Sequence, residues 1–518
     1  MILITSAKYV TTELQSEFGK IPPSFLPLGG KRLYEYQAKL FNNFNQKVIL
    51  SIPESFKISK SDRKRLNELN VNILHIPDGL TLGQSIIYAI NMNMPLDNTL
   101  QILHGDTYFE TIGQESNSLE VTRIESSYDW TFLAIYGESE FKIQNEYIKD
   151  IDSLILSGYF HIEKPYDFIR AVVKSNYSFI NGLKLYSQSY PFNIVENSTW
   201  LDFGLVSNYF HSKKAMTTER AFNSLYIENG FVTKSSQMVG KLDGEINWFN
   251  SFSEELSLYI PRFYSSKDGL SYKTEYLYHN TLSELFVFGK LPLYVWKKIF
   301  EALQSFLEKL HTVTIIDENI NFDYKYKTQE RLKVYANKNS INLDQTWIYN
   351  GEKMPSINKI VYTLDDYICK NDNVFSFIHG DFCFSNIMYD FKSGDIKVFD
   401  PRGIDFDGKV TAFGDKNYDY AKLMHSVIGL YDFIISGFYE CNINNYEISF
   451  IIDIDSEILE IQKLFFQMFH LEKEKTYAIM IHLFLSMLPL HDDNKNKQDA
   501  LLSNMFRLYK NLLEEMIE

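Results

Sequence analysis

The chain has 518 residues, of which 45% are hydrophobic and 23% are charged. This composition is ordinary for globular protein, and the length is too great for a single core, so we expect roughly two to four domains. The formal net charge of −15 argues against nucleic acid or an anionic membrane surface as the main partner, because both attract basic patches.

Short β-rich runs alternate with helical patterns over roughly the first 200 residues. The predicted strands are Met1–Thr5, Gln46–Ile52, Asn72–His75, Thr99–Leu103 and Trp130–Ile135. The predicted helices between them are Lys31–Asn43, Ser61–Leu69 and Thr81–Asn93. This alternation is typical of an α/β fold with a mostly parallel, Rossmann-like sheet that helices cover on both faces.

The pattern changes after Asn208. The polar stretch His211–Arg220 is typical of a connector. A boundary near residue 215 therefore divides the chain into a first domain, 1–214, and a second domain, 215–518. The second domain opens with a β-rich segment, a helix and two more strands. These are Ser224–Ser235, Leu242–Phe252, Leu256–Phe263 and Leu270–Tyr278.

Long helical patterns dominate from Leu291 onward, and a strand–loop–strand unit at Val374–Asp400 interrupts them. A small β-rich part followed by a larger helical part predicts an α+β domain with two lobes, in the order that kinases have. The longest apolar stretches, Ser426–Phe438 and Ala478–Leu490, are too short to span a membrane and predict buried helices.

The densest chemical signal is FSFIHGDFCFSNIMYDFKSGDIKVFDPRG, residues 375–403. Asp381 and Asn386 are close enough in the chain for one loop to present both side chains. Asp400 ends the apolar strand Ile396–Phe399 and could supply a second carboxylate. Phosphoryl transfer needs a group that orients the attacking hydroxyl and oxygen ligands for magnesium on the nucleotide phosphates. The segment resembles the H-G-D-x-x-x-x-N … D pattern of aminoglycoside phosphotransferases and choline or ethanolamine kinases.

This resemblance implies an ATP-dependent kinase of small molecules in which Asp381, Asn386 and Asp400 are catalytic. Asp381 would be the base, Asn386 and Asp400 would bind Mg²⁺, and His379 would shape the loop. The alternative is a hairpin whose polar residues only form turns. The helix ending LEKLH, which closes at His311, also matches this family.

Other parts of such a kinase have counterparts in the β-rich segment. Lys234, in FVTKS, resembles the lysine that binds the ATP phosphates, and Glu245 could pair with it from the next helix. Lys241 is the rival lysine if the strand register slips. Glu275–Leu277, with Glu275 and Leu277 at its two ends, resembles the hinge whose backbone recognises adenine. The family's glycine-rich loop, G-x-G-x-x-G, is absent between residues 224 and 234.

The segment GDKNYDYAKL, residues 414–423, resembles a further motif of these kinases, G-D-x-x-x-D-[LY]-A. We expect Asp415 and Asp419 to brace the catalytic loop or to cap a helix rather than to act in catalysis directly.

The first domain carries a second set of motifs. FLPLGGKRL contains Lys31, LHGDTYF contains Asp106, and WLDFG contains Asp202. Together with LGQSIIYAI and SGYFHI, they resemble sugar-nucleotide pyrophosphorylases and cytidylyltransferases. The resemblance implies that Lys31 binds the nucleotide and that Asp106 and Asp202 bind magnesium. The chemistry brings two anions together, so metal ions and lysines must offset their repulsion.

Residues 4–9, ITSAKY, depart from that family because they lack the glycines that let backbone N–H groups approach phosphates. Lys8 and Lys20 are the nearest cationic substitutes. The alternative is therefore that the first domain is a non-catalytic, nucleotidyltransferase-like binding module attached to a kinase.

Two such domains on one chain predict a bifunctional enzyme. It would phosphorylate a small alcohol or sugar with ATP and then transfer an NMP group to that phosphate. CTP is the favoured nucleotide, with UTP or dTTP as alternatives, and the product would be an activated donor for bacterial surface polysaccharide such as capsule. An antibiotic phosphotransferase is a further alternative.

The setting of the protein can also be predicted. The three cysteines have no metal-ligand spacing, which favours a reducing compartment. The first ten residues lack the basic leader of a secretory signal. We expect a cytoplasmic protein that binds nucleotides and small molecules without inserting into a membrane, and a homo-oligomer is possible.

Overall fold

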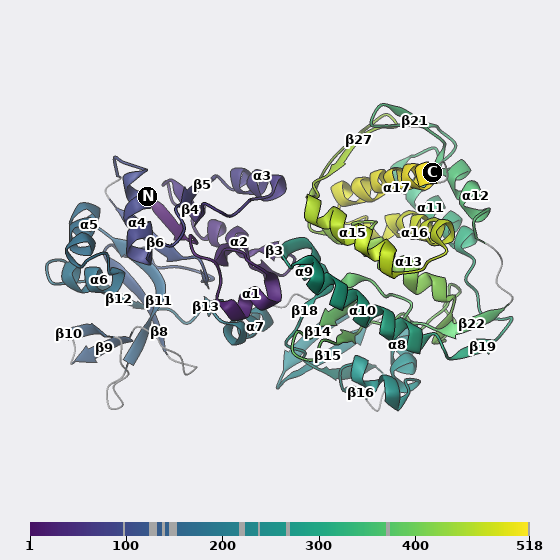
Figure 1. The fold of residues 1–518 in the computed structure, drawn as a ribbon, viewed down its shortest axis with the longest axis horizontal. Helices are drawn as coiled ribbons and strands as arrows, with labels where there is room; N and C mark the ends of the chain where they lie inside the picture. The colour runs from purple at the N-terminus through teal and green to yellow at the C-terminus, as the bar shows by residue number, and fades with distance from the viewer. Residues whose placement is uncertain are drawn as a thin grey trace. The chain divides into compact units, whose positions relative to one another are not determined.

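The computed structural model describes residues 1–96, 99–123, 132–136, 140–144, 153–216, 223–236, 239–265, 270–368 and 373–515. The chain divides into two units (Figure 1). Unit 1 comprises Met1–Thr217 with Phe288–Lys290, and unit 2 comprises Thr218–Val287 with Leu291–Glu518. The boundary predicted near residue 215 lies close to this division.

Unit 1 is built on a sheet whose strands follow the order β10-β9-β11-β6-β1-β4-β5, with β8 pairing to β11 and β12 pairing to β8. Strands β6, β1, β4 and β5 are parallel to one another, whereas β11 runs antiparallel to β6. The strands are β1 (Ile2–Thr5), β4 (Val48–Pro53), β5 (Val71–Ile76), β6 (Leu100–His104), β8 (Ser118–Arg123), β9 (Phe132–Tyr136), β10 (Glu140–Gln144), β11 (Ser153–Ile162) and β12 (Asn193–Glu196).

Helices cover both faces of this sheet because its strands are apolar on both sides. Leu3 and Ile102 face a core that α4, α5 and α6 complete. Their neighbours Ile2 and Ile4 are fully buried as well, as expected for parallel strands covered on two faces. The helices are α1 (Thr12–Phe18), α2 (Leu33–Leu40), α3 (Lys60–Glu68), α4 (Leu82–Asn91), α5 (Pro165–Lys174), α6 (Phe179–Ser187) and α7 (Val206–Ala215), with the short elements η1 (Pro23–Phe25), β2 (Pro27–Leu28), β3 (Lys31–Arg32), β7 (Thr107–Tyr108) and β13 (Leu201–Asp202).

The predicted α/β fold class is therefore confirmed, and the predicted strands and helices match β1, β4, β5, β6, α2, α3 and α4. Residues 130 and 131 of the predicted strand Trp130–Ile135 lie outside the described residues. The connector predicted at His211–Arg220 is wrong in its first half, because α7 extends to Ala215. Tyr209 is buried and donates a hydrogen bond of 2.7 Å to the Pro27 carbonyl, which anchors a helix with an otherwise polar sequence.

Unit 2 begins with an antiparallel sheet of order β14-β15-β17-β16, against which α8 packs. These elements are β14 (Asn223–Glu228), β15 (Phe231–Ser236), α8 (Val239–Asn250), β16 (Phe263–Ser265) and β17 (Ser271–Glu275). The strand predicted at Leu256–Phe263 is wrong over most of its length, because Glu254–Tyr259 forms the 3₁₀ helix η2. Leu256 and Tyr259 are both buried, and their spacing matches one turn of a 3₁₀ helix.

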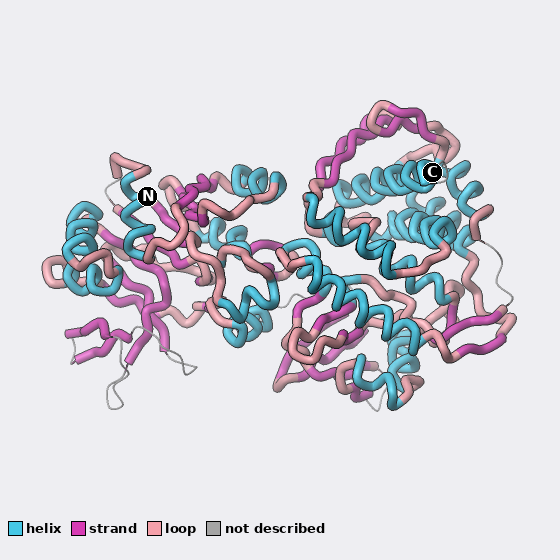
Figure 2. Tube along the Cα trace, viewed as in Figure 1, coloured by secondary structure: helices cyan, strands magenta, loops and turns pink. Residues whose placement is uncertain are grey.

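Helices make up most of the remainder of unit 2 (Figure 2). The central helix is α16 (Lys473–Met487), which packs against α11 (Tyr324–Asn339), α13 (Lys416–Val427) and α17 (Lys495–Glu515). Its twelve residues from Lys475 to Ser486 are all buried, so the apolar stretch beginning at Ala478 is a core helix as predicted. The other helices are α9 (Leu282–Phe288), α10 (Leu293–Leu310), α12 (Ile357–Asp365), α14 (Tyr431–Ile435), α15 (Ser456–Met468) and η4 (Leu488–His491).

Three small sheets complete unit 2. One has the order β18-β23-β24, another has the order β19-β22-β25, and a four-stranded sheet has the order β21-β20-β27-β26. Their strands are β18 (Asn280–Thr281), β19 (Thr314–Ile316), β20 (Trp347–Tyr349), β21 (Glu352–Met354), β22 (Val374–Phe377), β23 (Ile387–Tyr389), β24 (Ile396–Val398), β25 (Phe413–Gly414), β26 (Tyr439–Asn444) and β27 (Glu447–Ile452). Among the described residues, no helix has the length and apolar character needed to cross a membrane.

Candidate functional site

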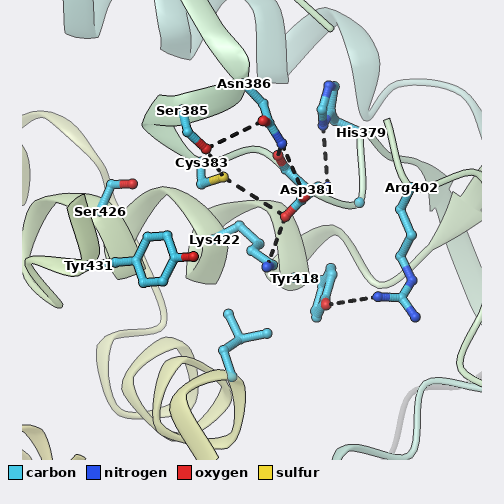
Figure 3. Close-up of polar contacts among 12 residues, drawn as sticks. His379, Asp381, Cys383, Ser385, Asn386, Arg402, Tyr418, Lys422, Ser426 and Tyr431 are labelled. Atoms are coloured by element: carbon cyan, nitrogen blue, oxygen red, sulfur yellow. Dashed lines mark hydrogen bonds and ion pairs between the residues drawn. The ribbon is translucent and has the colours of Figure 1, made fainter. Parts of the chain in front are cut away.

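The loop between β22 and β23 carries the first two predicted catalytic residues of unit 2 (Figure 3). The Asn386 amide Nδ2 donates to both the backbone carbonyl and the carboxylate Oδ2 of Asp381, each at 3.0 Å. Asn386 ends the short 3₁₀ helix η3 (Phe384–Asn386). The two polar residues of the motif therefore lie in contact, as their spacing in one loop predicted.

Lys422, on α13, holds the other oxygen of the Asp381 carboxylate. Its ammonium Nζ lies 2.8 Å from Asp381 Oδ1. Burial alone would raise the pKa of Asp381, but the Lys422 ammonium holds this pKa well below its usual range. The same ion pair raises the pKa of Lys422 despite the burial that acts against it. Asp381 is therefore an ionised carboxylate at neutral pH, held between an amide and an ammonium.

Asp419 holds the start of the loop between β22 and β23 in place, as predicted. Its carboxylate accepts hydrogen bonds from the backbone N–H groups of His379, at 2.9 Å, and Gly380, at 2.8 Å. His311 Nε2 lies 3.2 Å from the same carboxylate. Asp415 caps α13 by accepting from the Asn417 backbone N–H. His379, His311 and Asp419 therefore fix the shape of the loop, whereas Asp415 fixes the start of α13.

Lys234, on β15, links the β-rich part of unit 2 to Asp400. Asp400 lies in the loop between β24 and β25, called the Asp400 loop below. Its Nζ donates to Glu245 Oε2 at 2.7 Å and to Asp400 Oδ1 at 2.9 Å. Burial acts against the Lys234 ammonium, but the two carboxylates raise its pKa above the ordinary value. The Tyr272 hydroxyl also donates to Glu245 Oε2, at 2.7 Å. The structure thus places Lys234, rather than the exposed Lys241, against Glu245.

Two glycines allow α8 to approach the Asp400 loop closely enough for this contact. A Cβ at Gly244 would lie 2.7 Å from the Gly403 carbonyl oxygen, and a Cβ at Gly403 would lie 2.0 Å from the Gly244 carbonyl oxygen. Asp400 itself has a φ of 55°, in the left-handed region. A non-glycine residue in this region is strained, and such residues concentrate at functional sites.

Asn386 and Asp400 could hold a divalent cation. Phe399, next to Asp400, donates its backbone N–H to the Asn386 carbonyl at 3.1 Å, so the two loops are tied together. The Asp400 side chain is 25% exposed although it faces Lys234, which leaves carboxylate surface for a metal ion. Carboxylate and amide oxygens are the ligands that Mg²⁺ prefers in proteins, so these residues fit the predicted metal.

The predicted hinge lies at the end of β17. The Glu275 backbone N–H donates to the Arg262 carbonyl at 3.0 Å, and Tyr276 donates to the Gly230 carbonyl at 2.8 Å. The Glu275 carboxylate lies 3.7 Å from the Arg262 guanidinium. Leu277 is half-buried just beyond the strand. The hinge assignment of Glu275 and Leu277 stays a prediction.

In unit 1, Asp106 and Asp202 lie next to each other across the β7–β13 pair. Asp202 is opposite Thr107, and the Phe203 N–H donates to the Asp106 carbonyl at 2.8 Å. A Cβ at Gly204 would lie 3.0 Å from Asp106 Oδ2 and 3.5 Å from Asp202 Oδ1. Burial and the Asp106 carboxylate raise the pKa of Asp202 to about 7. A divalent cation would relieve this repulsion, so the pair fits the predicted magnesium site.

The turn that carries Asp106 is held rigidly. Gln37, on α2, donates its side-chain amide to the carbonyls of His104, Gly105 and Thr107 at 3.2, 3.0 and 2.9 Å. A Cβ at Gly105 would lie 2.6 Å from the Thr5 carbonyl oxygen, so the close approach of β1 requires glycine there. Burial lowers the pKa of His104, which is therefore neutral beside Asp106.

A cavity of about 700 Å³ opens beside Asp106, between the end of β1, α1 and the start of α4. Its lining includes Lys8, Gln15, His104 and Gly204. This volume suits a nucleotide-sized ligand. Lys31 is exposed in β3 and is not among the residues that line the cavity, so Lys8 is the predicted lysine that the structure places there. Lys20 instead lies 4.3 Å from the centre of the Tyr9 ring.

Four contributors to these sites were not assigned from the sequence: Lys422, Tyr272, Gln37 and His104. Lys422 belongs to the quoted segment 414–423, and its place on the helix that begins at Asp415 was a usable signal. Tyr272 and Gln37 act through contacts between residues far apart in the chain. No local pattern could have identified them.

No known protein family matches this sequence, and no curated protein matches it. Solved structures are similar to its N-terminal part. One is a nucleoside-diphosphate-sugar pyrophosphorylase from Vibrio cholerae RC9, at 13% identity and a TM-score of 0.35, covering 41% of this chain and 100% of that one. The inositol-1-phosphate CTP transferase from T. maritima shows 15% identity and a TM-score of 0.32, covering 40% and 90%. A UDP-glucose pyrophosphorylase complexed with UDP-glucose shows 12% identity and a TM-score of 0.33, covering 41% and 97%.

Proposed function

We propose that unit 2 transfers the γ-phosphoryl group of ATP to a hydroxyl of a small alcohol or sugar. The observation that carries this proposal is the Lys234 ammonium, bonded at once to Glu245 and Asp400. An ion pair of this kind positions the lysine for nucleotide phosphates in kinases. Asp381 and Asn386 occupy the loop that is tied to Asp400 through Phe399.

In the proposed reaction the acceptor oxygen forms a bond to the γ-phosphorus while the bond from that phosphorus to the β,γ-bridging oxygen breaks, and ADP leaves. Asp381 orients the hydroxyl and accepts its proton as the transfer proceeds. The lowered pKa keeps Asp381 ionised, so its main contribution is to orient the hydroxyl, and it accepts the proton as the oxygen–phosphorus bond forms and the hydroxyl becomes more acidic. Magnesium on Asn386 and Asp400 would neutralise the phosphate charge.

We propose a second activity for unit 1, the transfer of an NMP group from an NTP to a phosphate monoester. The Asp106–Asp202 pair beside the 700 Å³ cavity favours it. A phosphate oxygen of the acceptor would attack the α-phosphorus of the NTP, and pyrophosphate would leave. CTP is the favoured nucleotide by analogy with enzymes that make CDP-activated donors, and UTP or dTTP are the alternatives. The whole chain would then phosphorylate its substrate and activate the product as a donor for bacterial surface polysaccharide.

The kinase proposal is tested by measuring ADP release from ATP with a panel of small alcohols and sugars. Asp381→Asn removes the ionised carboxylate, and we expect it to lower kcat by about 10²–10⁴-fold, the usual contribution of a positioned base. Asp395→Asn is the matched control, because Asp395 is an exposed acid at the start of β24. Acceptor-dependent ADP release that survives in Asp381→Asn would contradict the assignment.

A non-catalytic binding module remains the alternative for unit 1. The two readings differ in pyrophosphate release from an NTP in the presence of a supplied phosphate monoester. An active unit 1 releases pyrophosphate, and the release depends on Asp106. A binding module binds the nucleotide but releases no pyrophosphate.

A further inference from the structure

Unit 2 gathers cationic side chains on one side of Asp381. Lys327 and Arg331 lie one turn apart on α11, Arg402 lies in the same loop as Asp400, and Lys422 lies on α13. Lys327 and Arg402 lie over the rings of Phe406 and Tyr418, Lys422 lies over the Tyr418 ring, and Arg331 is close enough to Arg402 and Tyr418 to interact with them electrostatically. Residues one helical turn apart project from the same face of a helix.

The distances to these rings define the cluster. Lys327 Nζ lies 3.7 Å from the centre of the Phe406 ring and 5.6 Å from the centre of the Tyr418 ring. The Arg402 guanidinium carbon lies 5.3 Å and 6.0 Å from the same two centres. Lys422 Nζ lies 5.9 Å from the Tyr418 centre. Three cationic groups from three segments of the chain therefore converge on two aromatic rings.

Few of these charges are neutralised within the protein. Lys422 pairs with Asp381, and Arg402 donates to the Ile404 carbonyl at 2.9 Å. Across the ranges that the structure describes, Lys327, Arg331 and Arg402 form no ion pair with a carboxylate. Half-buried cations without an ionic partner are costly, because burial removes the water that would solvate them.

The positive charges of the cluster also lower the pKa values of Lys327 and Arg331. Burial, Arg402, Lys422 and Arg331 lower the pKa of Lys327 well below its ordinary value, and Asp381 is the carboxylate that opposes them. Burial and then Arg402 also lower the pKa of Arg331. A bound anion would relieve this repulsion and raise the pKa of Lys327 again.

The two oxygens of Asp381 separate this cluster from the proposed metal site. Oδ2 accepts from Asn386, whereas Oδ1 faces Lys422. Figure 3 shows Asn386 on one side of Asp381 and Lys422 with Tyr418 on the other. The nucleotide and its metal belong to the side of Asn386 and Asp400 in the proposed reaction, so the acceptor belongs to the side of the cationic cluster.

We propose that the acceptor is an anionic alcohol, and that Lys327, Arg331 and Arg402 bind its carboxylate or phosphate group while Asp381 orients its hydroxyl. This inference rests on the proposed kinase function of unit 2. It excludes amino alcohols as preferred acceptors, because an ammonium group would meet several like charges. Carboxylate and phosphate are both recognised by guanidinium and ammonium groups.

The first test measures ADP release by the full chain with acceptors that differ in one group: glycerol, glycerate, glycerol 3-phosphate and 3-amino-1,2-propanediol. We expect one of the two anionic acceptors to exceed glycerol in kcat/KM by about 10–100-fold, the worth of a hydrogen bond to a charged group. The better anion identifies carboxylate or phosphate as the recognised group. Equal or faster turnover of glycerol or the amine would overturn the inference and leave the kinase intact.

A second measurement is independent of the carbon skeleton of the acceptor. Thermal unfolding of the full chain is followed with glycerate, glycerol 3-phosphate or inorganic phosphate, at matched ionic strength. We expect at least one anion to stabilise the wild type in a saturable way, and Lys327→Met to lose that stabilisation. Lys333→Met is the control, because Lys333 is an exposed lysine on α11 that pairs with Glu330. No saturable effect, or an equal effect in Lys327→Met, would overturn the inference.

The KM values separate acceptor binding from nucleotide binding. Lys327→Met is expected to raise KM for the acceptor by about 10–100-fold and to leave KM for ATP within about 2-fold. An equal rise in KM for ATP would assign the cluster to the nucleotide and overturn the inference. If no acceptor gives ADP release above the Asp381→Asn background, the kinase proposal itself fails.

Discussion

Two half-buried aspartates show how strongly a neighbouring charge determines whether an acid is ionised. Burial raises the pKa of both Asp381 and Asp202. At Asp381 the Lys422 ammonium reverses this effect, whereas at Asp202 the Asp106 carboxylate adds to it. The first acid is ionised at every physiological pH. The second titrates close to neutrality, which makes it sensitive to both pH and bound cations.

The raised pKa of Asp202, about 7, predicts a pH-dependent gain in stability for Asp202→Asn. The ordinary pKa of the unfolded chain lies far lower, so the folded wild type binds a proton that the unfolded chain has released. Its stability relative to the variant therefore falls as the pH rises toward 7. We expect the melting temperature of Asp202→Asn to exceed that of the wild type by about 2–4 °C at pH 8. The two melting temperatures should be closer at pH 5.

Differential scanning calorimetry at the two pH values, in the absence of divalent cations, checks this expectation. Mg²⁺ should bring the melting temperatures of the wild type and Asp202→Asn closer together at pH 8, because the cation relieves the repulsion between Asp106 and Asp202 in the wild type. The same difference at pH 5 and pH 8 would show that the pKa of Asp202 is not raised in the folded protein.

At the scale of elements, the position of α8 determines whether Lys234 can reach both of its carboxylate partners. Glu245 follows directly after Gly244 on this helix, and Asp400 and Gly403 belong to the loop between β24 and β25. The backbones of these two glycines are too close for a side chain on either one. The helix and the loop are therefore joined by a glycine contact that positions the ion pairs of Lys234.

Gly244→Ala is predicted to disturb this contact, because the new Cβ would lie 2.7 Å from a backbone oxygen. We expect a loss of about 1–3 kcal/mol in the free energy of unfolding, as for overpacked cores, and at least a 10-fold loss in the kcat of ADP release. Gly240→Ala, on the same helix, meets no atom within 4 Å. That control should be neutral or stabilising by up to about 1 kcal/mol, since alanine favours helix. Equal effects of the two substitutions in denaturant unfolding would contradict the role of the glycine contact.

At the scale of the whole molecule, each of the two units carries its own set of acids. Asp106 and Asp202 belong to unit 1, whereas Asp381 and Asp400 belong to unit 2. Each pair is surrounded by residues of its own unit, such as Gln37 for Asp106 and Lys422 for Asp381. The chemistry of one unit should therefore survive the loss of the other.

We predict that Asp106→Ala abolishes pyrophosphate release from an NTP and a supplied phosphate monoester while ADP release stays within about 2-fold of the wild type. Asp381→Asn should have the reverse effect. Glu68→Gln, an exposed acid at the end of α3, is the control for unit 1. Loss of both activities in either variant, measured by separate ADP and pyrophosphate assays, would contradict two independent sites.

Local patterns were sufficient for the parallel strands of unit 1 and the helices between them, and for the β-rich opening of unit 2 apart from η2. Alternating apolar runs predicted β1, β4, β5 and β6, and the motif around residues 375–403 predicted the contact between Asp381 and Asn386. The failures have a common cause. Helix α7 and the 3₁₀ helix η2 are stabilised by the burial of Tyr209, Leu256 and Tyr259, and burial depends on partners elsewhere in the chain.

The sequence by itself determined the two-unit α/β and α+β organisation and the acids that the candidate sites contain, because periodicity and motif spacing are local properties. The tertiary structure decided which lysine meets Glu245, where Lys31 and Lys8 lie relative to the cavity, and that Lys422 holds Asp381. It also brought Lys327 and Arg402 together over the rings of Phe406 and Tyr418, with Arg331 close to Arg402. Electrostatic energy depends on the distance between charges in space. A cluster of charges that faces a substrate therefore forms only when distant segments of the chain fold together.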